Sequence, residues 1–127
     1  MINITQLDHL VLTVKSIEVT CAFYQNILGM EIITFGDNRK ALKFSNQKIN
    51  LHELGKEFEP KAYKPCSGAI DMCLISDTPL KNIISHLNQH NISIEEGPIE
   101  RTGATGKLLS VYIRDPDKNL IEISNHV

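Results

Sequence analysis

The order of secondary-structure elements expected from this sequence occurs twice along the chain, and this repeat constrains the fold more than any other feature. Alternating and apolar runs predict strands, and apolar stripes at helical spacing predict helices. The expected elements are a strand, a helix and three strands at 7–14, 17–28, 30–35, 40–44 and 48–53, and again at 69–76, 79–89, 93–100, 108–114 and 120–125. The sequence therefore predicts an α+β fold of two βαβββ modules, at about 1–53 and 69–127, joined by a polar linker at about 54–68.

The ends of both helices carry residues with a known preference for those positions. Ser16 is the expected N-cap of the first helix, and Gly29 is its expected stop. Thr78 or Asp77 is the expected cap of the second helix, with Pro79 in its first turn.

Composition limits the class of protein and of partner. With 127 residues, 42% of them hydrophobic and 22% charged, the chain predicts one globular domain with a sizeable core. The net charge is −2 and the 13 Lys and Arg residues form no basic tract, so we expect no nucleic-acid partner. No apolar run approaches the ~18 residues of a membrane span, and the polar start is not a signal peptide. Three widely spaced cysteines without a CxxC pair favour a reducing compartment, the cytoplasm.

The last expected strand carries a carboxylate in an apolar setting. The preceding residues 115–119 form an Asp-Pro-Asp-Lys-Asn run, which is typical of a turn. In the strand, Ile121 and Ile123 share one face, and Glu122 lies on the other face. A half-buried carboxylate is costly unless it is paired, protonated or bound to a cation.

Superposition of the two modules brings further polar residues to equivalent positions. Aligned first strands place His9 opposite Asp71, and aligned last strands place Glu122 opposite the segment that contains Asn50 and His52. The two halves would direct His9, Asp71, Glu122 and one of Asn50 or His52 toward a shared centre. Imidazole and carboxylate ligands suit a divalent metal and leave positions open for a substrate.

The chain resembles the vicinal oxygen chelate superfamily, which includes glyoxalases, fosfomycin-resistance proteins and extradiol dioxygenases. The segments that carry the resemblance are residues 7–12, 23–30, 48–53 and 114–122. The resemblance implies that the two modules curl into an open mixed β barrel with peripheral helices around a metal. It also implies a site often completed across a homodimer.

Two of the family's four ligand positions match, and two depart from it. His9 and Glu122 lie on the first and last ligand positions. Asp71 stands where the family usually has His or Gln, and Asn50 stands where glyoxalase I has Glu, with His52 one step further along the same face. The implied metal ligands are His9, Glu122, Asp71 and His52, and the implied ion is Ni, Co, Zn, Mn or Fe.

Other polar residues are candidates for substrate binding. Arg101 or Arg114 could meet a carboxylate of the substrate, and Tyr112 shares a face with Arg114. Asn50 is a further candidate contact. The glycine-rich residues 101–107 do not form a P-loop, because Leu108 opens a strand rather than a helix.

The leading functional hypothesis is a metal-dependent glyoxalase-like lyase or isomerase. It would act on a small α-oxo or hydroxy-carbonyl compound, possibly a thiol adduct, through a metal-stabilised enediolate, with Glu122 or Asp71 as the catalytic proton carrier. One alternative is an extradiol-type dioxygenase, for which His9, His52 and Glu122 could bind iron. The other is a metal-free binding or resistance protein, which Asp71 and Asn50 would favour.

Overall fold

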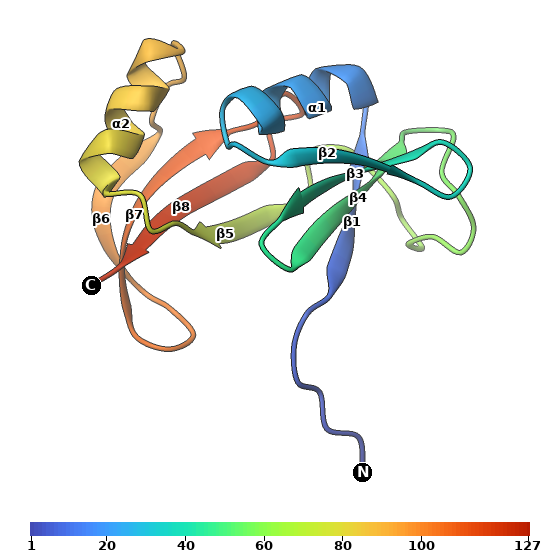
Figure 1. Cartoon of the computed structure of the whole chain (residues 1–127), viewed down its shortest axis with the longest axis horizontal. Helices are drawn as coiled ribbons and strands as arrows, with labels where there is room; N and C mark the ends of the chain where they lie inside the picture. The colour runs from blue at the N-terminus through green and yellow to red at the C-terminus, as the bar shows by residue number, and fades with distance from the viewer. The chain divides into compact units, whose positions relative to one another are not determined.

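Two four-stranded mixed sheets, each with one helix, make up the computed structural model, which describes all residues from 1 to 127 (Figure 1). The elements of the first half are β1 (His9–Val14), α1 (Ile17–Asn26), β2 (Glu31–Phe35), β3 (Arg39–Phe44) and β4 (Gln47–Glu53). Those of the second half are β5 (Asp71–Ile75), α2 (Leu80–Gln89), β6 (Glu96–Thr102), β7 (Lys107–Arg114) and β8 (Leu120–His126). This order confirms the predicted α+β fold of two βαβββ modules. Neither helix is long and apolar enough to cross a membrane.

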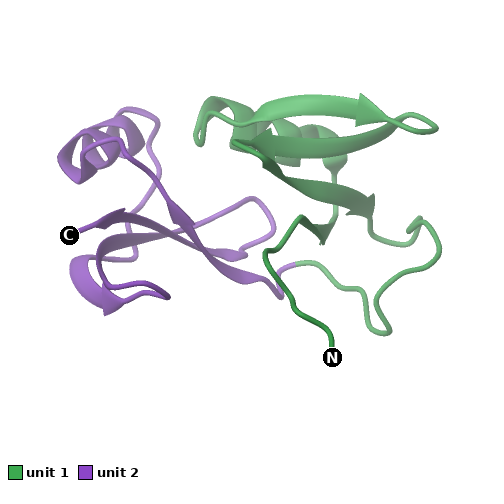
Figure 2. Ribbon diagram, turned by 60° about the horizontal axis from the view of Figure 1, so that its bottom comes forward, with its two compact units in different colours: residues 1–67 green, residues 68–127 purple.

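The chain divides into two compact units, coloured separately in Figure 2. Unit 1 consists of residues 1–67 and unit 2 of residues 68–127. Most of the segment expected to be a linker therefore belongs to unit 1. Its Glu57 side chain is buried, accepts a hydrogen bond from the Gly55 N–H and lies 3.6 Å from the Lys61 ammonium.

Unit 1 packs its helix against one face of its sheet. The strand order is β1-β4-β3-β2, with β1 and β4 parallel and the other neighbours antiparallel. Ser16 caps α1 as expected, because its side chain accepts a hydrogen bond from the Val19 N–H. Alternation along the strands sends every second side chain toward the helix. The buried apolar residues of this core include Leu12, Val14, Tyr24, Leu42, Ile49 and Leu51.

Unit 2 repeats the arrangement with the order β5-β8-β7-β6. The predicted turn before β8 is held by side chains. Asp115 Oδ1 accepts from the N–H groups of Asp117 and Asn119, and the buried Asn119 accepts at Oδ1 from the Ile70 N–H. The turn thereby fixes the start of β5 beside the start of β8. Ile121 and Ile123 are buried as predicted, together with Leu87, Val111 and Ile113.

Two local predictions were wrong. Pro79 itself is the N-cap residue of α2, and no side chain caps this helix, so neither Thr78 nor Asp77 does. Strand β6 begins at Glu96 rather than near Ser93, and a bulge between Glu96 and Ile99 shifts its pairing with β7.

Candidate functional site

The two sheets place the candidate residues at equivalent register positions. In unit 1, Asn50 of β4 pairs with Val11 of β1, and His9 lies two residues before Val11. In unit 2, Glu122 of β8 pairs with Cys73 of β5, and Asp71 lies two residues before Cys73. His9 therefore corresponds to Asp71 and Asn50 to Glu122, each on the sheet face that points away from the helix.

The two candidates of unit 1 differ in exposure and in partners. The His9 side chain is 44% exposed, and its Nδ1 lies 2.8 Å from the carboxylate of Asp8. A carboxylate at one ring nitrogen orients a histidine so that the other nitrogen, Nε2, can meet a ligand. Asn50 is only 6% exposed, and its Oδ1 has no hydrogen-bond partner. A buried amide oxygen without a donor is costly, which indicates that an ion, a water or a ligand satisfies it.

Serine hydroxyls surround the carboxylate of Glu122. Ser110 donates to Glu122 Oε2 at 2.7 Å, and Ser124 donates to the same oxygen at 3.3 Å. The two hydroxyl oxygens lie 2.6 Å apart, and both serines are fully buried. These hydrogen bonds orient the carboxylate on the sheet face.

Tyr112 and Arg101 lie on the same face as Glu122. Tyr112 of β7 pairs directly with Glu122, and its hydroxyl accepts a hydrogen bond from Arg101 Nε at 2.8 Å. Burial raises the pKa of Tyr112, the hydrogen bond from Arg101 lowers it, and the nearby Glu122 raises it. The Arg101 guanidinium is only loosely paired with Glu96, at 3.5 Å.

Arg114 differs from Arg101 because its guanidinium already forms an ion pair with a glutamate. Its Nε and Nη2 each lie 2.9 Å from an oxygen of Glu95, which is a two-point ion pair. This contact lowers the pKa of the Glu95 carboxyl. Of the two arginines, Arg101 is therefore the better placed to meet a substrate anion.

Asp71 and Cys73 complete this face of unit 2. Asp71 is exposed and pairs with Leu120, which lies two residues before Glu122 on the neighbouring strand. Cys73 is a free thiol whose Sγ lies 3.3 Å from the Ser124 hydroxyl. Burial of the sulfur raises the pKa of Cys73, so the thiol is not activated as a nucleophile.

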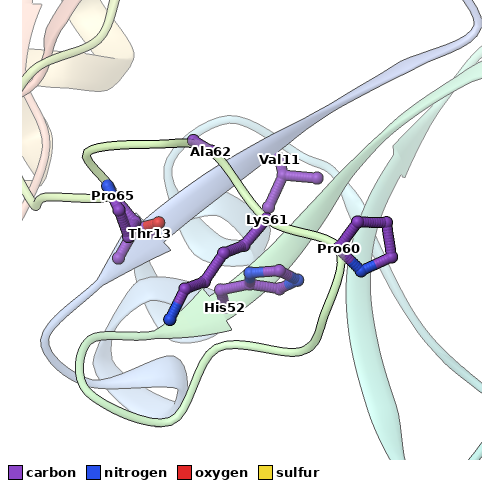
Figure 3. A pocket seen from close by; sticks show the side chains of 7 residues that line it. All are labelled: Val11, Thr13, His52, Pro60, Lys61, Ala62 and Pro65. Atoms are coloured by element: carbon purple, nitrogen blue, oxygen red, sulfur yellow. The ribbon is translucent and has the colours of Figure 1, made fainter.

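His52 is a buried histidine held by an arginine. It is 3% exposed, its Nε2 lies 3.3 Å from Arg39 Nη2, and its ring contacts Phe58 edge to face. Burial and the charge of Arg39 lower the pKa of His52. A pocket of about 210 Å³ adjoins the ring, and Figure 3 shows the side chains that line it.

Neither unit by itself gathers three His, Cys, Asp or Glu side chains that could hold a metal ion. His52 pairs with Thr13, four residues along β1 from His9. At the rise of a strand this separates the two histidines by about 13 Å. Asn50 pairs with Val11, only two residues along β1 from His9, so it is the nearer of the two β4 candidates to His9.

Three features of these faces were not predicted from the sequence. Ser110 and Ser124 beside Glu122 were not singled out, although Ser124 follows Glu122 by two residues and so shares its face. Ser110 lies within the otherwise apolar residues 108–111, which is a signal for a buried polar contact. Nothing in the sequence indicated that Arg39 meets His52.

Residues 6–123 match the family described as the Glyoxalase/Bleomycin resistance protein/Dioxygenase superfamily. The chain is 56% identical over 124 residues to virulence protein STM3117 of Salmonella typhimurium, covering 98% of this chain and 86% of that protein. The crystal structure of that protein has a TM-score of 0.98 and covers 99% of this chain and 100% of its own. The glyoxalase domain-containing protein RDO1 of Mycosarcoma maydis is 49% identical over 125 residues, covering 98% of this chain and 70% of its own.

More distant structures share the fold alone. Lactoylglutathione lyase from Agrobacterium tumefaciens is 19% identical, with a TM-score of 0.74 over 97% of this chain and 95% of its own. The fosfomycin resistance protein FosX from Listeria monocytogenes, in a complex with Mn(II), is 23% identical, with a TM-score of 0.67 over 98% of this chain and 93% of its own.

Proposed function

Because the chain belongs to the glyoxalase/bleomycin resistance protein/dioxygenase superfamily, we propose that it is a divalent-metal-dependent lyase or isomerase of glyoxalase type. Its substrate is a small α-oxo or hydroxy-carbonyl compound. The observation that carries the proposal is the equivalent register of the two sheets, in which His9 corresponds to Asp71 and Asn50 corresponds to Glu122.

The donor atoms of these residues fit a divalent ion. His9 offers an imidazole nitrogen, and Asp71 and Glu122 offer carboxylate oxygens, which is a donor set that Mn, Fe, Co, Ni and Zn accept. The unsatisfied Oδ1 of Asn50 supports a fourth contact, to the ion or to the substrate. His52 is not one of the proposed ligands, because its Nε2 is engaged by Arg39 and it lies beside Thr13, four residues along the strand from His9.

A metal bound by these residues would act as a Lewis acid toward two neighbouring oxygens of the substrate. The chain's own part in the reaction is to move a proton and to orient the substrate. Glu122 accepts a proton from the substrate carbon and returns it to the neighbouring carbon or oxygen, and Asp71 is the second candidate for this role. Ser110 and Ser124 hold the Glu122 carboxylate in place for the transfer.

The proposed substrate contact is a hydrogen-bond donor on the sheet face of unit 2 that carries Glu122. Arg101, loosely paired with Glu96 and fixed by Tyr112, binds an anionic group of the substrate. Arg114 keeps its structural pairing with Glu95.

The test is metal analysis of protein purified without chelator or nickel resin, with the variants His9→Ala and Glu122→Ala and with the exposed His126→Ala as control. We expect one divalent ion per chain in the wild type and in His126→Ala, and loss of the ion in the other two variants. The loaded protein should exchange a substrate proton with solvent or isomerise a hemithioacetal or an α-oxo acid. Absence of both reactions across such substrates would contradict the enzymatic proposal.

The second candidate is a metal-free small-molecule-binding protein, which the neutral amide of Asn50 at the position equivalent to Glu122 favours. Protein that contains no divalent ion and is not thermally stabilised by any added ion would support this candidate. The dioxygenase alternative has less support, because its second histidine, His52, is engaged by Arg39. Iron in the purified protein together with oxygen consumption on a catechol would restore it.

We also propose a cytoplasmic location and a homodimer. All three cysteines are free, which suits a reducing compartment.

A further inference from the structure

A pocket in unit 1 shares a sheet face with His9 and Asn50, but neither of these residues lines it. Residues of β1 and β4 form its floor, and residues of the segment 60–65 cover it (Figure 3). Its lining consists of Val11, Thr13, His52, Pro60, Lys61, Ala62 and Pro65, and its volume is about 210 Å³. This volume suits a molecule of a few carbon atoms rather than a drug-sized ligand, for which pockets of roughly 300 Å³ or more are usual.

The hydrogen bond from Arg39 fixes the tautomer of His52. A guanidinium can only donate, so the Nε2 atom 3.3 Å from Arg39 Nη2 must accept, and the ring proton is then on Nδ1. His52 is 3% exposed, and its Nδ1–H makes no hydrogen bond within the chain. Because His52 lines the pocket and this N–H has no partner in the chain, it is open to an acceptor from outside the chain.

The other two polar side chains of the pocket, Thr13 and Lys61, can both donate hydrogen bonds. Thr13, whose hydroxyl can donate a hydrogen bond, is 9% exposed. The Lys61 ammonium lies 3.6 Å from Glu57 and 3.4 Å from Glu59, both longer than the ~2.7–2.9 Å of a strong charge-assisted hydrogen bond. Glu57, the more buried of these two acids, is turned toward the Gly55 N–H by a short hydrogen bond. The remaining lining is apolar.

We propose that this pocket binds the carboxylate of a small aliphatic acid. The Nδ1–H of His52, the ammonium of Lys61 and the hydroxyl of Thr13 bind the carboxylate oxygens, and the apolar lining contacts the hydrocarbon part. The pocket lies within unit 1 and uses none of the residues proposed as metal ligands, so this site does not depend on the proposed enzymatic function.

The test follows the ring nitrogens of His52 by NMR in histidine-labelled protein during titration with sodium butyrate. Butan-1-ol serves as the uncharged probe of the same length, and sodium chloride serves as the ionic control. We expect a saturable shift of the His52 Nδ1 resonance with butyrate and none with butanol or chloride.

Two variants isolate the charged and polar contacts. Lys61→Met keeps the length of the side chain and should weaken butyrate binding by at least about fivefold. Thr13→Val keeps the shape of the side chain and should weaken binding by a smaller factor. Lys64→Met, in the same segment but outside the lining, should bind as the wild type does.

Three results would overturn the proposal. These are the absence of a saturable butyrate response, an equal response to butanol, and undiminished affinity in Lys61→Met. Because the experiment reads the His52 ring, its outcome is separate from the metal content measured for the proposed function.

Discussion

At the scale of single residues, the environment of His52 predicts a pH dependence of stability. Its folded pKa is lowered from the ordinary value of 6.5, first by burial and then by the charge of Arg39. As the pH falls through 6.5, the unfolded chain takes up a proton at His52 before the folded chain does. The free energy of unfolding should therefore fall on acidification below pH 6.5 and be fully recovered above it.

The measurement is urea unfolding at about pH 7.5 and about pH 5.5 for the wild type and His52→Gln. The wild type should lose more stability between the two values than His52→Gln does. The variant His126→Gln, at an exposed histidine, should lose as much as the wild type, because it leaves His52 and Arg39 unchanged. Equal losses in the wild type and in His52→Gln would show that His52 titrates normally in the folded chain.

At the scale of elements, the bulge of β6 depends on a glycine. Gly97 has φ +109°, and a Cβ there would meet the Ser110 carbonyl oxygen and lie 3.0 Å from Val111 Cα. Only glycine lets β6 approach β7 this closely. Gly97→Ala should lower the free energy of unfolding by roughly 3 kcal/mol or more, since it adds a backbone clash to the conformational strain.

The matched control for Gly97→Ala is Gly55→Ala. Gly55 also has a positive φ, +86°, but a Cβ there would have no atom within 4 Å. This variant should lose only the conformational term, roughly 1 kcal/mol. Urea unfolding of both variants measures the difference. Similar losses would mean that β6 moves away from β7 at little cost.

At the scale of the whole molecule, exposed strand edges support the proposed homodimer. β1 and β5 each form one edge of their sheets. Ile75 of β5 is 51% exposed, and apolar residues on edge strands favour pairing with another chain. Light scattering coupled to size exclusion should give twice the mass of one chain.

A charged side chain at the β5 edge should shift the equilibrium between single chains and homodimers toward single chains. Ile75→Lys is expected to increase the share of single chains. Val19→Lys, at a residue of α1 that is 54% exposed, should leave the mass unchanged. A wild type that elutes with the mass of one chain at every concentration would rule out the homodimer.

The sequence alone was enough to predict features that depend on neighbouring residues. The element order, the cap at Ser16, the turn at 115–119 and the alternation that buries Ile121 and Ile123 were all predicted and are confirmed. Each rests on spacing or on side-chain bonds within a few residues. The ends of β6 were misjudged, because they depend on which residues pair with β7, and local spacing does not encode this pairing.

Tertiary structure decided the surroundings of the candidate residues. Strand order and register bring Arg39 to His52, Ser110 to Glu122, and residues 60–65 to the face of β1 and β4. These contacts join residues distant in the sequence, and no local pattern encodes which side chain lies across a sheet. The sequence thus determined which residues share a face, and pairing between strands determined which of them keep a free donor or acceptor.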